Sequence, residues 1–161
     1  LVNNAAIAYD DLVTNLQLEP LEMMFRVNVF SAMQLTRFAI RNMLLHKVAG
    51  SIVHVSSISA HTGYKGLAMY AASKGALEAF SRNVAREWGR FGIRSNCVVP
   101  GFMETAMSNA LSDEQKAKIF KRTALQEPTS PVSVAALVGF LLDDRSQSVT
   151  GQSMVVDSGT L

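Results

Sequence analysis

The sequence predicts an α/β fold in which a parallel sheet is covered by helices on both faces. Four short apolar segments have the composition of buried strands, and segments with helical periodicity lie between them. Strands separated by helices of ten or more residues require crossover connections, which are right-handed in nearly all proteins. Ligands of such sheets bind beyond the carboxyl ends of the strands, so functional residues are expected at that edge.

The predicted strands are Leu1–Asn4, Ser51–Ser57, Ile93–Val99 and Ser153–Asp157. The second is the clearest, because its β-branched residues fit a pleated and buried surface. The strand ends carry polar or glycine residues, namely Asn3-Asn4, Ser56-Ser57, Pro100-Gly101 and Asp157-Ser158-Gly159. Polar chemistry is therefore expected to gather along one edge of the sheet.

Three segments have the spacing of buried helices. Pro20 is tolerated in a first turn and opens a helix that continues to about Leu45. The other two run from about Ala68 to Phe91 and from Pro131 to about Asp143. Residues 103–126 predict one or two short helices with polar breaks.

Composition limits the class of protein. A length of 161 residues suits one domain, and a net charge of +2 without a basic run gives no support for nucleic-acid binding. The single cysteine, Cys97, excludes an internal disulfide and fits a reducing compartment, so we predict a cytoplasmic protein. No apolar run reaches the length of a membrane span, and the three histidines lack metal-ligand spacing. We predict no metal site and no membrane partner.

The chain opens at Leu1-Val2, inside what is predicted to be a buried strand, and without a methionine. A domain seldom begins on its own core. We therefore expect an N-terminal portion to precede this sequence.

Tyr70 and Lys74 are four residues apart on a predicted helix, which places both side chains on one face. A cation beside a phenol lowers the phenol's pKa, as acid–base work on an alcohol or carbonyl requires. Such a pair also occurs on ordinary solvated helices. Ser57, thirteen residues upstream of Tyr70, would hold the substrate oxygen, although strand-end hydroxyls also stabilise turns.

Asn28 interrupts an apolar helical face. Asparagine is a poor helix former, so its position indicates either a local kink or a specific polar contact.

These motifs, in this order and spacing, resemble the short-chain dehydrogenase/reductase family over essentially the whole chain. The resemblance rests on Asn3-Asn4-Ala5-Ala6, Asn28, Ser57, Tyr70 with Lys74, Pro100-Gly101 followed by Thr105, and Thr150-Gly151-Gln152. It implies a Rossmann-type, doubly wound, single domain, of which residues 1–161 form the C-terminal two-thirds. The first strands and the family's glycine-rich phosphate turn would then lie outside this chain. Ala6 departs from the family, which usually has glycine there.

The resemblance implies a catalytic set of Asn28, Ser57, Tyr70 and Lys74. In the family's chemistry Tyr70 exchanges a proton with the substrate oxygen, Ser57 hydrogen-bonds that oxygen, and Lys74 lowers the phenol's pKa. Asn28 would hold a water molecule that connects Lys74 to solvent. NAD or NADP would supply the hydride chemistry. The residues implied in binding it are Asn3, Ala5, Tyr70, Lys74, Pro100, Gly101 and Thr105.

The implied activity is interconversion of a ketone and a secondary alcohol. A narrower alternative is 3-oxoacyl-carrier-protein reductase, and an alternative of another class is a non-catalytic binding or assembly protein. Residues 103–126 would form an apolar lid over a small carbonyl or acyl substrate. Apolar residues on several faces of the first two long helices predict a homodimer or homotetramer.

Overall fold

The sheet has four parallel strands in the order β1-β2-β3-β4. The computed structural model describes residues 1–105 and 112–161. The strands are β1 (Val2–Asn3), β2 (Gly50–Val55), β3 (Ile93–Pro100) and β4 (Ser153–Val156). The parallel α/β architecture predicted from the sequence is confirmed, with strand bounds within one or two residues of those expected.

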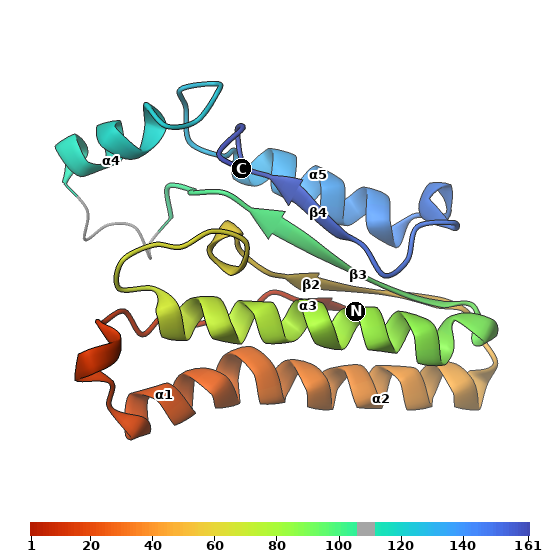
Figure 1. Cartoon of the computed structure of the whole chain (residues 1–161). Helices are drawn as coiled ribbons and strands as arrows, with labels where there is room; N and C mark the ends of the chain where they lie inside the picture. The colour runs from red at the N-terminus through yellow and green to blue at the C-terminus, as the bar shows by residue number, and fades with distance from the viewer. Residues whose placement is uncertain (106–111) are drawn as a thin grey trace.

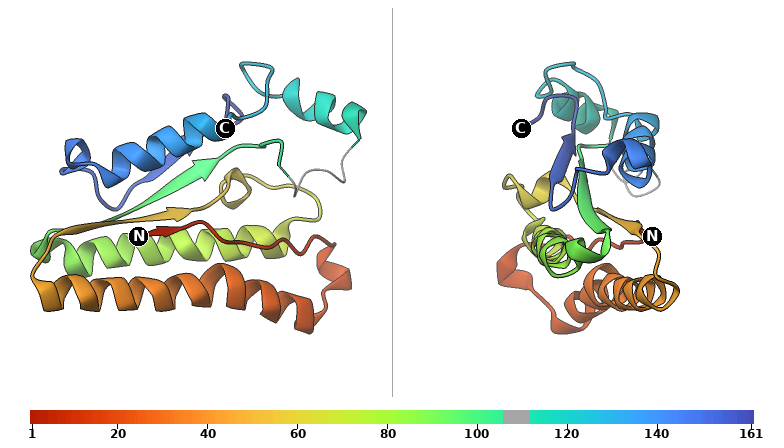
Figure 2. Two further views of the ribbon diagram at one scale, coloured as in Figure 1. Left: turned by 180° about the vertical axis from the view of Figure 1, so that it is seen from behind. Right: turned by 90° about the vertical axis from the view of Figure 1, so that its right-hand side faces the viewer.

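Helices cover both faces of this sheet (Figures 1 and 2). One layer holds α1 (Leu18–Phe25), the π-helical turn η2 (Arg26–Phe30), α2 (Ser31–His46) and α3 (Ala68–Trp88). The opposite face packs against α5 (Pro131–Leu142), and α4 (Asp113–Phe120) lies beyond the end of the sheet. Short 3-10 turns occur at Val13–Asn15, Ile58–Ala60, Gly89–Phe91 and Asp144–Ser146.

The two faces of the sheet bury separate apolar clusters. Residues of β2 and β3 alternate between these clusters, as side chains of a strand do. On the α2 and α3 side the buried cluster contains Ile40, Ile52, Val84 and Ile93. On the α5 side it contains Val53, Val98, Val134 and Leu141.

Helix α3 returns antiparallel to the strands, so its first turn lies at their carboxyl ends (Figure 1). Tyr70 is therefore close to the residues that follow β2. Within residues 1–105 and 112–161, no helix is long and apolar enough to cross a membrane. The same ranges contain no group of three or more His, Cys, Asp or Glu side chains that could hold a metal ion.

Candidate active site

Ser57 follows β2 directly and caps the 3-10 turn Ile58–Ala60. Its hydroxyl oxygen accepts from the Ser59 backbone N–H at 3.2 Å and from the Ser59 hydroxyl at 3.0 Å. The Ser57 side chain also interacts with the Tyr70 phenol, an interaction that lowers the phenol's pKa. Ser56 instead points into the core, where it is 3% exposed.

Burial raises the pKa of the half-buried Tyr70 phenol, the negative charge of Asp10 raises it further, and the Ser57 hydrogen bond opposes both. The expected lowering of this pKa by Lys74 is not what the structure has. The Lys74 ammonium lies 5.6 Å from the centre of the Tyr70 ring and donates to the Val55 carbonyl at 2.8 Å. Its hydrogen bond therefore goes to a strand carbonyl, and burial together with Asp10 leaves the Tyr70 pKa raised overall.

Lys74 is 2% exposed, and burial lowers its pKa to about 8. A desolvated ammonium is costly unless it is paired, and the bond to Val55 offsets only part of that cost. Lys74 therefore loses its proton far more readily than an ordinary lysine does.

Asn28 lies in the π-helical turn that joins α1 to α2, and it is 1% exposed. Its amide accepts from the Ile7 N–H at 2.8 Å and donates to the Ile7 carbonyl at 2.9 Å. It also donates to the Ser73 hydroxyl at 3.1 Å. The π turn and these bonds are the local distortion and the polar contact that the sequence indicated. Asn28 thereby ties the loop after β1 to the helix that carries Tyr70 and Lys74.

Replacing Asn28 with alanine is expected to lower the free energy of unfolding by about 2–4 kcal/mol, because Ile7 loses two partners in a partly buried site. Chemical denaturation measures this change. Asn83→Ala, on the exposed face of α3, is the control and should have an effect below about 1 kcal/mol. Equal stability of Asn28→Ala and the unsubstituted protein would contradict the role given to these bonds.

Several of the residues implied in coenzyme binding lie at or just after the carboxyl ends of β1 and β3, and Tyr70 and Lys74 lie on α3. The Asn3 amide nitrogen donates to the Thr36 hydroxyl at 3.1 Å and contacts His54 Nδ1 at 3.2 Å. Burial lowers the pKa of His54 to about 4, so its ring is neutral. Asn3 thus connects β1 to α2 and to β2. Ala5 is exposed after β1, and Thr105 is exposed next to residues 106–111, which lie outside the described ranges.

Pro100 is buried at the end of β3, and Gly101 follows it. A side chain at Gly101 would approach the Thr129 hydroxyl to 2.4 Å and the Asp157 Cα to 2.7 Å. Glycine is therefore needed here for packing against β4 and the loop before α5, whatever else it contacts.

Only part of the predicted lid segment can be placed. Of residues 103–126, the structure describes 103–105 and 112–126, and α4 is the helix they contain. Its start is fixed by a capping box between Ser112 and Gln115. Met107 and Leu111, two of the apolar residues expected to cap the substrate, lie outside the described residues. Phe102 and Phe120 stack at 5.9 Å and connect α4 to the segment after β3.

Sequence reasoning missed a buried carboxylate, Glu78, which is 5% exposed. Its acceptors bind Ser56, His61 and Ser153. Its burial could have been inferred from its position four residues after Lys74, because that spacing places it on the face of α3 that packs against the sheet.

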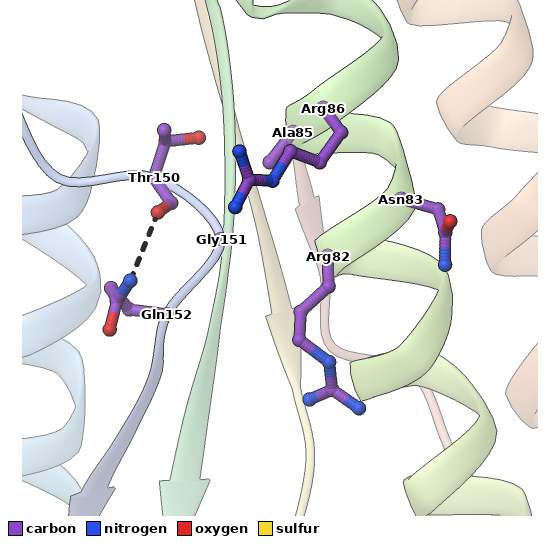
Figure 3. Close-up of a pocket in the computed structure, with 7 residues that line it drawn as sticks. All are labelled: Arg82, Asn83, Ala85, Arg86, Thr150, Gly151 and Gln152. Carbon is purple, nitrogen blue, oxygen red and sulfur yellow. Dashed lines mark hydrogen bonds between the residues drawn. The ribbon is translucent and has the colours of Figure 1, made fainter.

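A cavity of about 560 Å³ lies away from this site. It is between the C-terminal half of α3 and the turn before β4, where Arg86 extends toward Gly151 (Figure 3). None of the candidate catalytic or coenzyme-binding residues lines this cavity, so it is separate from the candidate active site.

A parallel sheet of this topology, with a Ser–Tyr contact and a buried lysine at its carboxyl edge, is the arrangement implied by the resemblance to the short-chain dehydrogenases/reductases. The family model described as Enoyl-(Acyl carrier protein) reductase matches residues 1–160. The chain belongs to this family, within the short-chain dehydrogenases/reductases.

Individual relatives agree with the family match. Carbonyl reductase [NADPH] 2 of Sus scrofa is 38% identical over 163 residues, which cover 100% of this chain and 67% of that protein. The 3-oxoacyl-[acyl-carrier-protein] reductase of Chlamydia pneumoniae is 36% identical, covering 99% and 64%. The crystal structure of gluconate 5-dehydrogenase from Burkholderia cenocepacia, in complex with NADP and tartrate, matches with a TM-score of 0.95 and 27% identity, covering 99% and 63%. The chain thus spans about two-thirds of the length of these relatives.

Proposed function

We propose that the protein is an NAD(P)-dependent oxidoreductase that interconverts a ketone and a secondary alcohol. The observation that carries the proposal is the contact between the Ser57 hydroxyl and the Tyr70 phenol at the carboxyl edge of the sheet. Relatives whose names include a carbonyl reductase, a 3-oxoacyl reductase and an NADP-bound dehydrogenase support it.

When bound, NAD or NADP would supply or accept the hydride. Ser57 donates a hydrogen bond to the substrate oxygen, and Tyr70 gives that oxygen its proton during reduction. Because its pKa is raised, the phenol keeps its proton at neutral pH, which suits the reductive direction. Lys74 lies one helical turn away and would bind the coenzyme's ribose, while Asn28 would continue a proton path toward solvent.

The proposed coenzyme-binding residues lie at or after the ends of β1 and β3 and on α3. They are Asn3, Ala5, Tyr70, Lys74, Pro100, Gly101 and Thr105. We further propose that residues 1–161 are the C-terminal two-thirds of one domain, with residues 103–126 as its lid. The free and buried Cys97 fits a cytoplasmic location, since its pKa is raised to about 12, mainly by burial, and the thiol is inert at neutral pH.

The direct test is turnover of NADH and NADPH by the complete polypeptide with a panel of ketones and 3-oxoacyl thioesters. Consumption of reduced coenzyme that depends on a ketone would support the proposal. Preference for thioesters on an acyl carrier protein would favour the narrower alternative suggested by the Chlamydia relative. Coenzyme binding without turnover of any substrate would favour the non-catalytic alternative.

A second copy of the chain is the proposed partner. Helices α2 and α3 enclose an open, largely apolar groove of about 220 Å³. Its apolar lining comes from Met33, Ile40, Leu44, Phe80, Val84 and Trp88. Further apolar side chains on α2 are exposed, among them Phe30, Leu35 and Phe38. Covering such a surface would bury area that water otherwise contacts, so we propose a homodimer or homotetramer built on α2 and α3.

Met33→Glu, in this groove, is expected to shift the assembled protein to monomer at micromolar concentration, because a charged carboxylate would have to give up its hydration at the apolar interface. Light scattering measures the change. Val13→Glu, at an apolar residue that is 64% exposed and distant from the groove, should leave the oligomer intact. A monomeric unsubstituted protein would refute the assembly.

A further inference from the structure

We propose that Glu78 is a positioning residue that fixes Ser57 against Tyr70. The inference rests on the proposed function and adds to it a residue outside the Asn28, Ser57, Tyr70 and Lys74 set. Glu78 is on α3, one turn after Lys74, so it belongs to the same rigid element as the phenol.

The residues on both sides of the turn that Ser57 caps, Ile58–Ala60, are bound to the Glu78 carboxylate; we call this segment the Ser57 turn. Ser56, the residue before Ser57, donates to Oε1 at 2.6 Å. His61, the residue that ends the Ile58–Ala60 turn, contacts the two carboxylate oxygens at 2.9 and 3.0 Å. A displacement of this turn relative to α3 must therefore break bonds to one carboxylate.

The same carboxylate reaches the fourth strand. Ser153 of β4 donates to Oε2 at 2.8 Å, and Arg82 lies at 3.9 Å from that oxygen. The side chain is 7% exposed, so these partners replace nearly all of its hydration. Hydrogen bonds to a charged and buried acceptor are short and strong, and such a network holds its members in one arrangement.

A carboxylate suits this place better than the neutral amide of the same shape. Its two oxygens accept from Ser56, His61 and Ser153 at once. Glutamine offers one acceptor oxygen and an NH₂ group that cannot accept, so at least one of these donors would lose its partner. The substitution Glu78→Gln therefore loosens the Ser57 turn with little change in volume.

A double-mutant cycle in the complete polypeptide tests the inference. Alone, Glu78→Gln is expected to lower kcat for ketone reduction about 10-fold, because small displacements of a reacting group are costly, and to change KM less than about twofold. In a Ser57→Ala background the same substitution should change kcat by less than about twofold, because the group it positions is gone. Glu22→Gln, an exposed carboxylate four residues before Arg26, is the matched control and should leave kcat unchanged.

Other outcomes overturn the inference. Equal losses of kcat in the two backgrounds, or no loss in the first, would show that Glu78 does not act through Ser57. If Glu78→Gln does not fold, His61→Gln takes its place in the cycle with the same criteria, since the His61 side chain is 32% exposed and the carboxylate keeps its bonds to Ser56 and Ser153. Absence of ketone reduction by the unsubstituted protein would instead overturn the proposed function, and this inference with it.

Discussion

Tyr70→Phe is expected to lower kcat for ketone reduction about 1,000-fold, within the range that positioned acid–base groups contribute. Phenylalanine keeps the ring and its contact with the Lys74 ammonium, which lies 5.6 Å from the ring centre. It removes the O–H group that contacts Ser57 and that would protonate the substrate oxygen. The substitution therefore tests the role of the phenol's proton without changing the packing of the ring.

The measurement is steady-state turnover with saturating coenzyme, together with thermal unfolding of the same preparation. Tyr9→Phe is the control, because its hydroxyl accepts a single exposed hydrogen bond from the Gln17 N–H at 3.0 Å. That variant should keep its activity. Full reductase activity in folded Tyr70→Phe would defeat the catalytic assignment.

The layout of the fold was predictable because its signals are local. Apolar runs and helical periodicity located four strands and the long helices, and they required a parallel sheet. The interruption at Asn28 was also visible as a polar residue on an apolar face, although the sequence does not specify a π-helical turn. The spacing of Ser112 and Gln115 matches a capping box and therefore indicates the start of α4.

The site was less predictable where its geometry depends on distant parts of the chain. A spacing of four placed Tyr70 and Lys74 on one face, but it could not reveal that the ammonium donates to Val55, nineteen residues earlier. Glu78 gathers partners that are 22 and 75 residues away in sequence. Only the register of the parallel strands brings those partners together, so no local pattern encodes them.

Lys74→Met is expected to make the coenzyme-free protein more stable at neutral pH while it removes reductase activity. Burial lowers the Lys74 pKa from 10.5 to about 8, which corresponds to about 3 kcal/mol of destabilisation while the amine is charged. The methionine variant also loses the hydrogen bond to the Val55 carbonyl, which lowers its free energy of unfolding by about 1–2 kcal/mol. A net gain of about 1–2 kcal/mol in the free energy of unfolding remains for the methionine variant at pH 7.

The way in which the stability gain of Lys74→Met changes with pH distinguishes the cost of burying a charged amine from a general effect on packing. Between pH 8 and 10.5 the unfolded chain binds a proton at Lys74 that the folded chain has released, so the stability of the unsubstituted protein rises there. The advantage of Lys74→Met should therefore be full below about pH 8 and shrink as the pH approaches 10.5. Denaturant unfolding at several pH values measures it, with the exposed Lys118→Met as a flat control. If the only role of Lys74 were to stabilise the fold, Lys74→Met would lower the free energy of unfolding at pH 7. A variant that is more stable but inactive would show that the buried ammonium serves function.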